Sequence, residues 1–396
     1  MKIEDPVVIV SFARTPMGSF QGTFKDTPAT ALGARSIEAA IRRAGIDTAA
    51  INEVFMGNVL SAGLGQAPAR QASLAAGIPN TVGSTTINKM CGSGMKAVML
   101  AHDLIMADGE RIIVAGGMES MTNAPYLLAK ARAGLRIGHG KIYDHMYLDG
   151  LEDAYDKGRL MGTFAEDCAD AYAFGREKQD EYAASSVRRA QKALENGAFA
   201  DEIVPVTVSD KSGEHAVATD EQPLRVRIEK IPELKPAFRP GGTVTAANSS
   251  CISDGAAALV LMRLSRAETL GLSPVARILS HASYAGAPSL FTTAPVYAIR
   301  SLLGKLGLAA ADIDLFEINE AFAVVALAAM HDLGLPWDKV NIHGGACALG
   351  HPIGASGARI LVTLLAAMDK YRLKLGVASL CIGGGEATGL AVEMLH

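Results

Sequence analysis

Apolar side chains recur at helical spacing in two stretches that lie far apart in the chain. Residues 31–44 and 294–306 each place apolar residues three and four positions apart, which predicts two amphipathic helices. Each stretch is followed by a Gly and a polar linker, and then by a short apolar run within residues 51–58 and 313–320. Short apolar runs bounded by turn residues predict buried strands, so each stretch indicates a helix followed by a strand.

A second pair of matching segments keeps the same order. Cys91-Gly92-Ser93-Gly94 precedes a helical pattern over 95–106 and a strand pattern over 111–115 that ends in two glycines. Its counterpart is Gly354-Ala355-Ser356-Gly357, followed by a helical pattern over 358–368 and a strand pattern over 376–381 that ends near three glycines. Strands that alternate with helices predict βαβ units with parallel strands. We therefore expect two similar α/β halves packed face to face; chance similarity between βαβ units is the alternative.

The segment between the halves has a different character. Residues 120–250 contain charged stretches, Pro-bounded pieces and an amphipathic pattern over 179–196, which we interpret as a lobe inserted on the first half. Such insertions commonly shape substrate pockets or oligomer contacts. The expected organisation is a first half of residues 1–120 and 251–272, an inserted loop domain of residues 121–250, and a second half of residues 273–396.

Composition and charge narrow the function classes. The 396 residues are 49% hydrophobic and 20% charged, enough to bury a large core. A net charge of −4 gives no broad basic field for nucleic acid, although local cations and N–H groups can hold an anionic small ligand. No window offers the roughly 18 apolar residues of a membrane helix, and the first residues lack a signal-peptide pattern. The 5 cysteines show no disulfide framework, so we expect reduced thiols and a cytoplasmic location.

Cys91 is the first candidate for chemistry. It lies between a strand pattern and a helix start, and a thiol at a helix N-terminus faces unpaired N–H groups and the positive end of the helix dipole. Both favour the thiolate. The flanking glycines allow a sharp turn and a close ligand approach. The alternative is a small buried core cysteine, which is how we interpret Cys168 and Cys251.

Three further candidates lie in the second half. His351 stands between Gly350 and Pro352, which predicts a shaped loop; a hydrogen-bonded structural histidine is the alternative. Cys381 ends a strand before three glycines, whose N–H groups suit an oxyanion hole. Asn319 ends the matching strand, as a turn former or as the holder of a water molecule. Because functional groups in parallel sheets gather at the carboxyl ends of strands, we expect these side chains and Cys91 to form one site.

A metal site is a competing interpretation of the same region. His343, Cys347 and His351 are spaced by four, which would align three ligands on one face of a helix. The glycines and Pro352 disfavour a helix there, so no metal site is expected.

Taken together, these motifs resemble the thiolase family over the full chain. The matching stretches, in family order, are residues 88–94, 116–121, 319–322, 344–357 and 381–385. The resemblance implies a five-layered α-β-α-β-α fold made from two duplicated halves with an inserted loop domain. It also implies reversible Claisen condensation with coenzyme A thioesters as substrates and no separate cofactor. Dimers or tetramers are implied as well, with a tetramer contact near residues 126–145.

The resemblance implies a role for each site residue. Cys91 matches the acylated nucleophile, Cys381 the acid/base that removes an α-proton, and His351 the residue that activates Cys91. Asn319 matches the holder of a water molecule in one oxyanion hole, and the N–H groups of Cys91 and Gly383 match the other. The residues expected around coenzyme A and the acyl group are Ser250, Leu151, Phe238, Phe291, Phe322, Leu160, Met161 and Arg225; for Arg225 a solvated side chain is the alternative.

Two departures from the family pattern concern the acyl group. Leu160 precedes Met161 where members that favour acetoacetyl-CoA often carry His, and Phe291 stands near where many members have Met. The main hypothesis is condensation of two acetyl-CoA into acetoacetyl-CoA and CoA; the alternative is a degradative 3-ketoacyl-CoA thiolase for longer or branched chains. A decarboxylating ketoacyl synthase is disfavoured by Cys381, where that chemistry usually has a second His or an Asn. A coenzyme A-binding scaffold would form no covalent intermediate.

Overall fold

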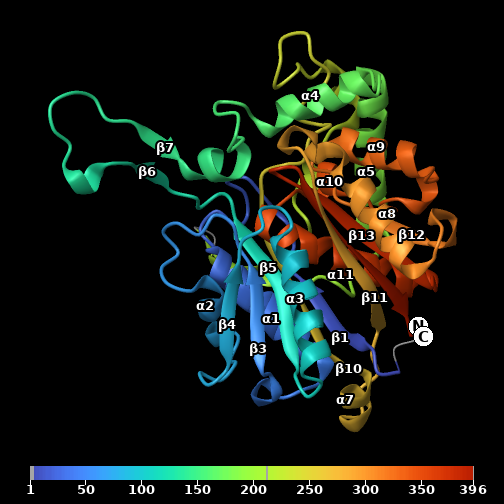
Figure 1. The fold of residues 1–396 in the computed structure, drawn as a ribbon. Helices are drawn as coiled ribbons and strands as arrows, with labels where there is room; N and C mark the ends of the chain where they lie inside the picture. Colours follow the sequence, from blue (N-terminus) through green and yellow to red (C-terminus); the bar gives the residue numbers. More distant parts are fainter. Residues whose placement is uncertain (1–3, 211–212, 396) are drawn as a thin grey trace.

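Two helices, α3 (Ser93–Ala107) and α11 (Ile353–Tyr371), form the central layer of the fold. In the computed structural model, which describes residues 4–210 and 213–395, they pack against each other between two groups of strands (Figure 1). Helix α11 contacts the strands β5 (Ile113–Ser120), β10 (Ser253–Arg263), β12 (Leu315–Ile318) and β13 (Leu375–Ile382). The outermost residues of the two predicted halves, 1–3 and 396, lie outside the described residues.

Glycine allows the two central helices to approach closely. A Cβ added at Gly94 would lie 2.8 Å from the backbone N of Ala358, and one added at Gly357 would lie 2.4 Å from the backbone N of Met95. Each glycine thus faces the residue that follows the other glycine, so the helices cross in a locally symmetric way. The repeated glycines of the sequence are explained by this crossing, because any side chain there would push the helix backbones apart.

The strands lie in two groups that follow the duplication. The first group has the order β4 (Gly83–Ile87), β3 (Glu53–Gly57), β5, β10, β1 (Val7–Arg14), and the second has the order β12, β13, β14 (Glu386–Met394), β11 (Ala276–Ala285). A short pairing of β1 with β11 joins them into one sheet, and β2 (Gly18–Ser19) pairs with β10.

Strand direction differs between the repeated units and the rest of the sheet. Strands β3, β4 and β5 are mutually parallel, as are β12 and β13, which confirms the predicted βαβ units. Strands β1, β10, β11 and β14, which lie outside the predicted units, pair antiparallel with their neighbours. An apolar run shows that a strand is buried but does not encode its direction.

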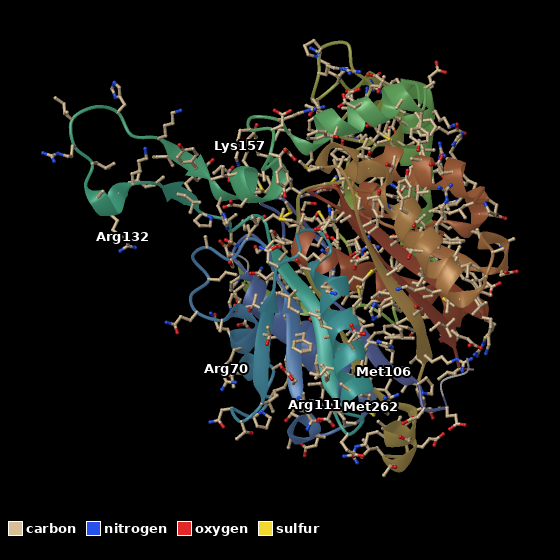
Figure 2. All side chains as sticks on the ribbon, in the orientation of Figure 1. Arg70, Met106, Arg111, Arg132, Lys157 and Met262 are labelled. Carbon is tan, nitrogen blue, oxygen red and sulfur yellow. The ribbon has the colours of Figure 1, made fainter. Side chains whose placement is uncertain are left out.

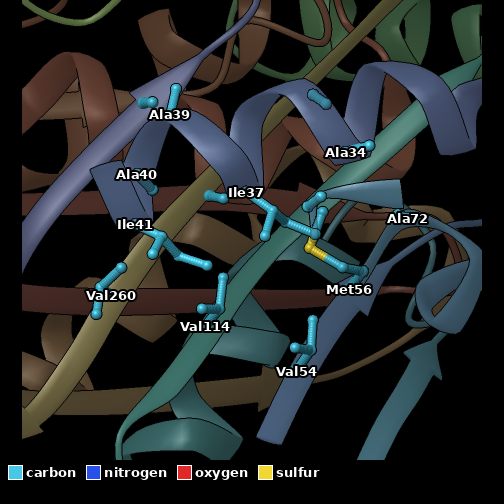
Figure 3. Close-up of a cluster of buried hydrophobic side chains, with 14 of the residues drawn as sticks. Ala34, Ile37, Ala39, Ala40, Ile41, Val54, Met56, Ala72, Val114 and Val260 are labelled. Atoms are coloured by element: carbon cyan, nitrogen blue, oxygen red, sulfur yellow. The ribbon is translucent and has the colours of Figure 1, made fainter. Parts of the chain in front are cut away.

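Outer helices complete the five layers. Helices α1 (Ala29–Ala44) and α2 (Pro68–Ala75) cover the first group of strands, and Figure 3 shows Ile37 and Ile41 of α1 beside Val114 and Val260. Helices α8 (Ala294–Leu306) and α9 (Ala323–Leu333) cover the second group. Both α1 and α8 end at a left-handed glycine, Gly45 at φ 69° and Gly307 at φ 66°, which confirms the two predicted helices. The predicted α-β-α-β-α fold is confirmed.

The insert leaves the first half but packs largely against the second. Phe164 of α4 (Met161–Ala171) and Tyr182 of α5 (Arg176–Glu195) share a buried cluster with Phe291 and Val324 of the second half. The hairpin of β6 (Tyr126–Leu128) and β7 (Ile142–Asp144) projects from the body, with Arg132 near its tip (Figures 1 and 2). None of the helices in the described part of the chain is long and apolar enough to cross a membrane.

The remaining elements are short. They are η1 (Thr48–Ala50), η2 (Ala131–Ala133), the π-helical turn η3 (Tyr147–Leu151), β8 (Val206–Asp210), β9 (Gly213–Val217), α6 (Gln222–Arg225), η4 (Ile228–Glu233), α7 (Leu264–Thr269), η5 (Pro288–Thr293), η6 (Ala310–Asp312), η7 (Trp337–Lys339) and α10 (Ala346–Leu349).

Candidate active site

Cys91 lies in the tight turn between β4 and α3. The preceding residue, Met90, has φ 47°, a left-handed conformation that is costly for a residue other than glycine. The hydroxyl of Ser93 stabilises this turn, because it accepts a hydrogen bond from the Lys89 N–H at 2.9 Å and donates to the Met90 carbonyl at 2.6 Å. The strained turn places Cys91 on the wall of a small internal pocket.

Two connected pockets contain the predicted site residues. The inner pocket, of about 60 Å³, is lined by Cys91, His351, Cys381, Gly383 and Phe291 among others. The outer pocket, of about 520 Å³, is lined by residues that include Leu160, Phe238 and Arg225. The residues that line both pockets are Leu151, Met161, Ser250 and Phe322. Side chains from both halves and from the insert therefore meet around one continuous space, with the two thiols and the imidazole at its narrow end.

His351 is held by a residue that the sequence analysis missed. Its Nδ1 lies 2.5 Å from the hydroxyl of Ser356, which in turn lies 2.9 Å from the Pro352 carbonyl. If the Ser356 hydroxyl donates to that carbonyl, it accepts from Nδ1–H, and Nε2 of His351 then carries the free lone pair. The signal for Ser356 was its place in the repeated Gly-rich tetrapeptide, where it corresponds to Ser93.

Asn319 does not line either pocket but contacts His351 from behind. The Asn319 side-chain nitrogen lies 3.4 Å from His351 Nδ1. Within residues 4–210 and 213–395, neither Asn319 Oδ1 nor His351 Nε2 has a hydrogen-bond partner, although both atoms are buried. Buried polar atoms are rarely left unpaired. These two atoms are therefore suited to a water molecule or a substrate oxygen.

Burial makes the resting site electrically neutral. It raises the pKa of Cys91 to about 11, against the opposing effect of the Gly383 and Cys91 N–H groups, and it raises the pKa of Cys381 well above its usual value. Burial, together with the charge of Arg359, lowers the pKa of His351 to about 3. The N–H groups at the start of α3 favour the thiolate, as the sequence indicated, but desolvation has the larger effect on the pKa of Cys91. A neutral imidazole with a free lone pair is nevertheless ready to accept a proton.

Glu119 connects the loop that follows β3 to the start of α11, a role not predicted from the sequence. It is fully buried at the end of β5 and accepts hydrogen bonds from Asn58 Nδ2 at 2.9 Å, Val59 N at 3.1 Å, Leu60 N at 3.1 Å and Gly354 N at 2.8 Å. Gly354 is the second residue of α11, the helix that follows His351. Burial raises the pKa of Glu119 to about 7 despite these donors. A carboxylate inside an apolar strand with two adjacent glycines was the available signal.

The other histidine and cysteines considered from the sequence do not line the inner pocket. His343 contacts the rings of Phe199 and Tyr371, and the Cys347 thiol lies 3.8 Å from the Glu320 carbonyl. Only residues 346–349 of that segment form a helical turn, so the spacing by four does not align three ligands. Cys168 packs in the core between the insert and the second half. Cys251 lines the outer pocket, and its carbonyl accepts the His351 N–H at 3.0 Å.

Comparison with known proteins is consistent with this geometry. Residues 7–265 match the N-terminal domain of thiolase and residues 272–394 match its C-terminal domain. The chain is 53% identical over 391 residues to acetyl-CoA acetyltransferase of Escherichia coli (strain K12), with 98% of this chain and 99% of that protein covered. It is 51% identical over 393 residues to acetyl-CoA acetyltransferase 2 of Arabidopsis thaliana, with coverage of 98% and 97%.

Solved structures show the same similarity. The Acat5 thiolase from Ascaris suum, solved in complex with coenzyme A, superposes with a TM-score of 0.93 at 44% identity and covers 98% of this chain and 100% of its own. The acetyl-CoA acetyltransferase of Bacillus anthracis superposes with a TM-score of 0.96 at 41% identity, with coverage of 98% and 99%. Both domain matches, the full-length relatives and the fold lead to one conclusion: the chain belongs to the thiolase family.

Proposed function

We propose that the protein is an acetyl-CoA C-acetyltransferase, which joins two acetyl-CoA molecules into acetoacetyl-CoA and CoA and catalyses the reverse cleavage. The observation that carries this proposal is that Cys91, Cys381 and His351 line the same inner pocket of about 60 Å³. Its relatives with the name acetyl-CoA acetyltransferase, about half identical over the whole chain, support the same reaction.

The first half-reaction transfers an acetyl group to Cys91. His351 Nε2 accepts the proton of the Cys91 thiol as the sulfur attacks the thioester carbonyl of acetyl-CoA. The resulting oxyanion takes hydrogen bonds from donors already at the site, and the C–S bond to CoA then breaks. Cys381 donates its proton to the departing CoA thiolate, so this half-reaction ends with an acetyl-Cys91 thioester, an imidazolium at His351 and a thiolate at Cys381.

The second half-reaction forms the carbon–carbon bond. Cys381, as its thiolate, removes an α-proton from a second acetyl-CoA, and the enolate attacks the acetyl carbonyl on Cys91. The Cys91–acyl bond breaks, acetoacetyl-CoA is released, and the Cys91 thiolate recovers the proton held by His351. The buried Cys381 thiol has a strongly raised pKa, so it becomes a strong base when its proton moves to the departing CoA. The N–H of Gly383, which interacts with the Cys91 sulfur, supports a role for this residue as a donor to the acyl oxygen.

The outer pocket has the size and chemistry for coenzyme A. Its volume of about 520 Å³ lies in the usual range for ligand sites, and Phe238 and Leu151 provide apolar walls. Arg225 brings a cation to the rim while it pairs with Glu221 at 2.7 Å, which suits a phosphate contact. Ser250 stands where the two pockets meet. The coenzyme A bound to the Ascaris suum relative supports this assignment.

The narrow inner pocket favours a short acyl group over longer chains. Phe291 is buried on its wall and packs edge-on against Phe164 and Phe322, at ring-centroid separations of 6.2 Å and 6.5 Å. A degradative 3-ketoacyl-CoA thiolase for longer chains remains the alternative function. Rates of cleavage measured side by side on acetoacetyl-CoA and a C8 ketoacyl-CoA distinguish them, since a strong preference for the C8 substrate contradicts the proposal.

Mass spectrometry of the protein mixed with acetoacetyl-CoA tests the mechanism. We expect an acetyl adduct on the peptide that carries Cys91, absent in Cys91→Ser. With acetyl-CoA as the donor, Cys381→Ala should still form the adduct on Cys91 but lose condensation. An unmodified Cys91 peptide contradicts the covalent mechanism, and normal condensation by Cys381→Ala places the base elsewhere.

The wider setting follows from the same proposal. We infer that coenzyme A thioesters are the only small molecules required, with no metal or separate cofactor, and that the enzyme works in cytoplasmic fatty-acid metabolism. A homotetramer is supported by the projecting hairpin, where the exposed apolar side chains are Tyr126, Leu128, Leu135, Ile137, Ile142 and Tyr143. Exposed apolar surface of this kind marks protein contacts. Light scattering of the wild type and of Ile137→Asp tests whether the hairpin assembles dimers into tetramers.

A further inference from the structure

A cluster of His102, Asp103 and His281 lies outside the catalytic pockets. His102 and Asp103 belong to α3 in the first half, whereas His281 belongs to β11 in the second half. Asp103 Oδ1 lies 3.1 Å from His102 Nδ1 and 2.8 Å from His281 Nε2. Among residues 4–210 and 213–395, this is the one group of at least three His, Cys, Asp or Glu residues whose ligand atoms all lie within 4.8 Å of one another.

The spacing of these atoms is close to that of a metal coordination sphere. Zinc ligated tetrahedrally at about 2.0–2.1 Å holds its ligand atoms about 3.3 Å apart. The two short separations in the cluster, 3.1 Å and 2.8 Å, therefore need to lengthen by only a few tenths of an ångström. Two imidazoles and one carboxylate are the donors that zinc, cobalt, nickel and copper accept readily. A tetrahedral ion would keep one position for water.

The surroundings of the cluster permit an ion to enter. The His102 and His281 side chains are 13% and 18% exposed and so are held by packing, whereas Asp103 is 53% exposed. The two imidazole rings meet edge to face, with centroids 5.0 Å apart. The nearby cations are already engaged: Arg263 donates to the carbonyls of Asp5 and Met106, and Lys305 donates to the carbonyl of His281.

We propose that His102, Asp103 and His281 bind one divalent transition-metal ion, of which Zn²⁺ is the natural example, and that this ion links the two halves of the fold. Binding requires His102 Nδ1 and His281 Nε2 to present lone pairs, with their protons on the other ring nitrogens. The site lies apart from Cys91 and Cys381 and takes no part in acyl transfer. Its effect is on stability, because an ion bound only by the folded chain shifts unfolding toward the native state.

Titration of the full-length protein with Co²⁺, followed by visible absorption and by Zn²⁺ competition, tests the proposal. We expect one saturable site without the intense thiolate-to-cobalt band that cysteine ligation produces. His281→Ala should weaken binding at least tenfold, and Asp103→Asn, on an exposed side chain, should weaken it without harming the fold. The matched control is His331→Ala, because His331 forms a surface pair with Asp332 at 2.9 Å that lacks a third ligand.

Thermal unfolding provides the second measurement. Zn²⁺ should raise the melting temperature of the wild type and of His331→Ala but not that of His281→Ala. Equal Zn²⁺ affinity in the wild type and His281→Ala would overturn the proposal. So would a thiolate band in the cobalt spectrum, or the absence of saturable binding, which would leave the cluster as a hydrogen-bonded group only.

Discussion

Removal of the Glu119 carboxylate should slow acylation of Cys91, although Glu119 does not line the inner pocket. The carboxylate holds the backbone N–H of Gly354 at 2.8 Å, at the start of the helix that follows His351. A hydrogen bond to a charged acceptor contributes about 1.5–3 kcal/mol. If the whole of this contribution positions His351 in the transition state, Glu119→Ala lowers the acylation rate by about 10–100-fold, since about 1.4 kcal/mol corresponds to a factor of ten.

Glu119→Gln should have a smaller effect for a reason that lies in Asn58. Asn58 Nδ2 donates to Glu119 Oε1, and in the described residues Asn58 Oδ1 has no partner. If the new amide nitrogen replaces Oε1, a flip of the Asn58 amide gives it an acceptor, and the bond to Gly354 is kept. The Leu60 N–H then loses its acceptor, and the flip also breaks the 3.2 Å bond from Asn58 Nδ2 to the Met118 carbonyl, each at a cost of about 1–3 kcal/mol in stability. We therefore expect less than a tenfold loss of acylation rate.

The assay measures acetyl-Cys91 formation in a single turnover, normalised to the folded fraction. Glu166→Ala is the matched control, because Glu166 is also fully buried and accepts the N–H groups of Thr243 and Val244 at 2.9 Å each. Glu166 lies in the insert, so its loss should lower stability but leave the acylation rate unchanged. If Glu119→Ala acylates as fast as the wild type per folded molecule, or if the two variants lose acylation equally, the positioning argument fails.

Three other predictions follow from the structure. Burial raises the pKa of Cys91 from 9.0 to about 11, so iodoacetamide should alkylate Cys91 near pH 8 roughly 100-fold more slowly than a free cysteine. The alkylation rate should rise with pH. A rate that is already constant near pH 7 would indicate a thiolate–imidazolium pair instead. Phe291→Ala should raise kcat/KM for longer ketoacyl-CoA substrates, relative to acetoacetyl-CoA, about tenfold or more. Leu290→Ala should not, because the Leu290 side chain is exposed. An unchanged chain-length preference in Phe291→Ala would show that Phe291 does not limit the acyl pocket. Gly357→Ala should destabilise the fold by about 1–3 kcal/mol or more in urea unfolding, because its Cβ would meet the Met95 backbone. Gly304→Ala, at a helical site with open space, should be neutral or stabilising. Equal stabilities of the two variants would contradict the close crossing of the helices.

Much of the architecture was predictable because local signals agreed with the fold. The helix over 294–306 has the bounds that its apolar spacing and Gly307 indicate. The helix predicted over 358–368 begins earlier, at Ile353, because glycines that resemble a loop serve a close helix crossing instead. Only the packed structure shows that the glycines at 354 and 357 face another backbone.

The site was predictable where residue type and position carry chemistry. Cys91, His351 and Cys381 meet at one pocket, as strand-end positions in two repeats suggested, whereas Asn319 lies behind His351. The charge state of Cys91 was not predictable, because a sequence shows the helix start but not the depth of burial. Glu119 illustrates a similar limit: its motif was visible, but its four hydrogen-bond donors come from segments that are far apart in the sequence.

The order of strands in the first half also determines when each strand finds its partner during synthesis. Strand β10 lies between β1 and β5, but it follows the whole insert in the sequence. Thus Val7 pairs with Arg263, and Leu259 with Ala115, only after ribosomes have translated the intervening lobe. Until then β1 and β5 present apolar strand edges without partners, the condition in which nascent chains aggregate. A lower growth temperature, which weakens hydrophobic association between such edges, should therefore increase the soluble yield of this protein.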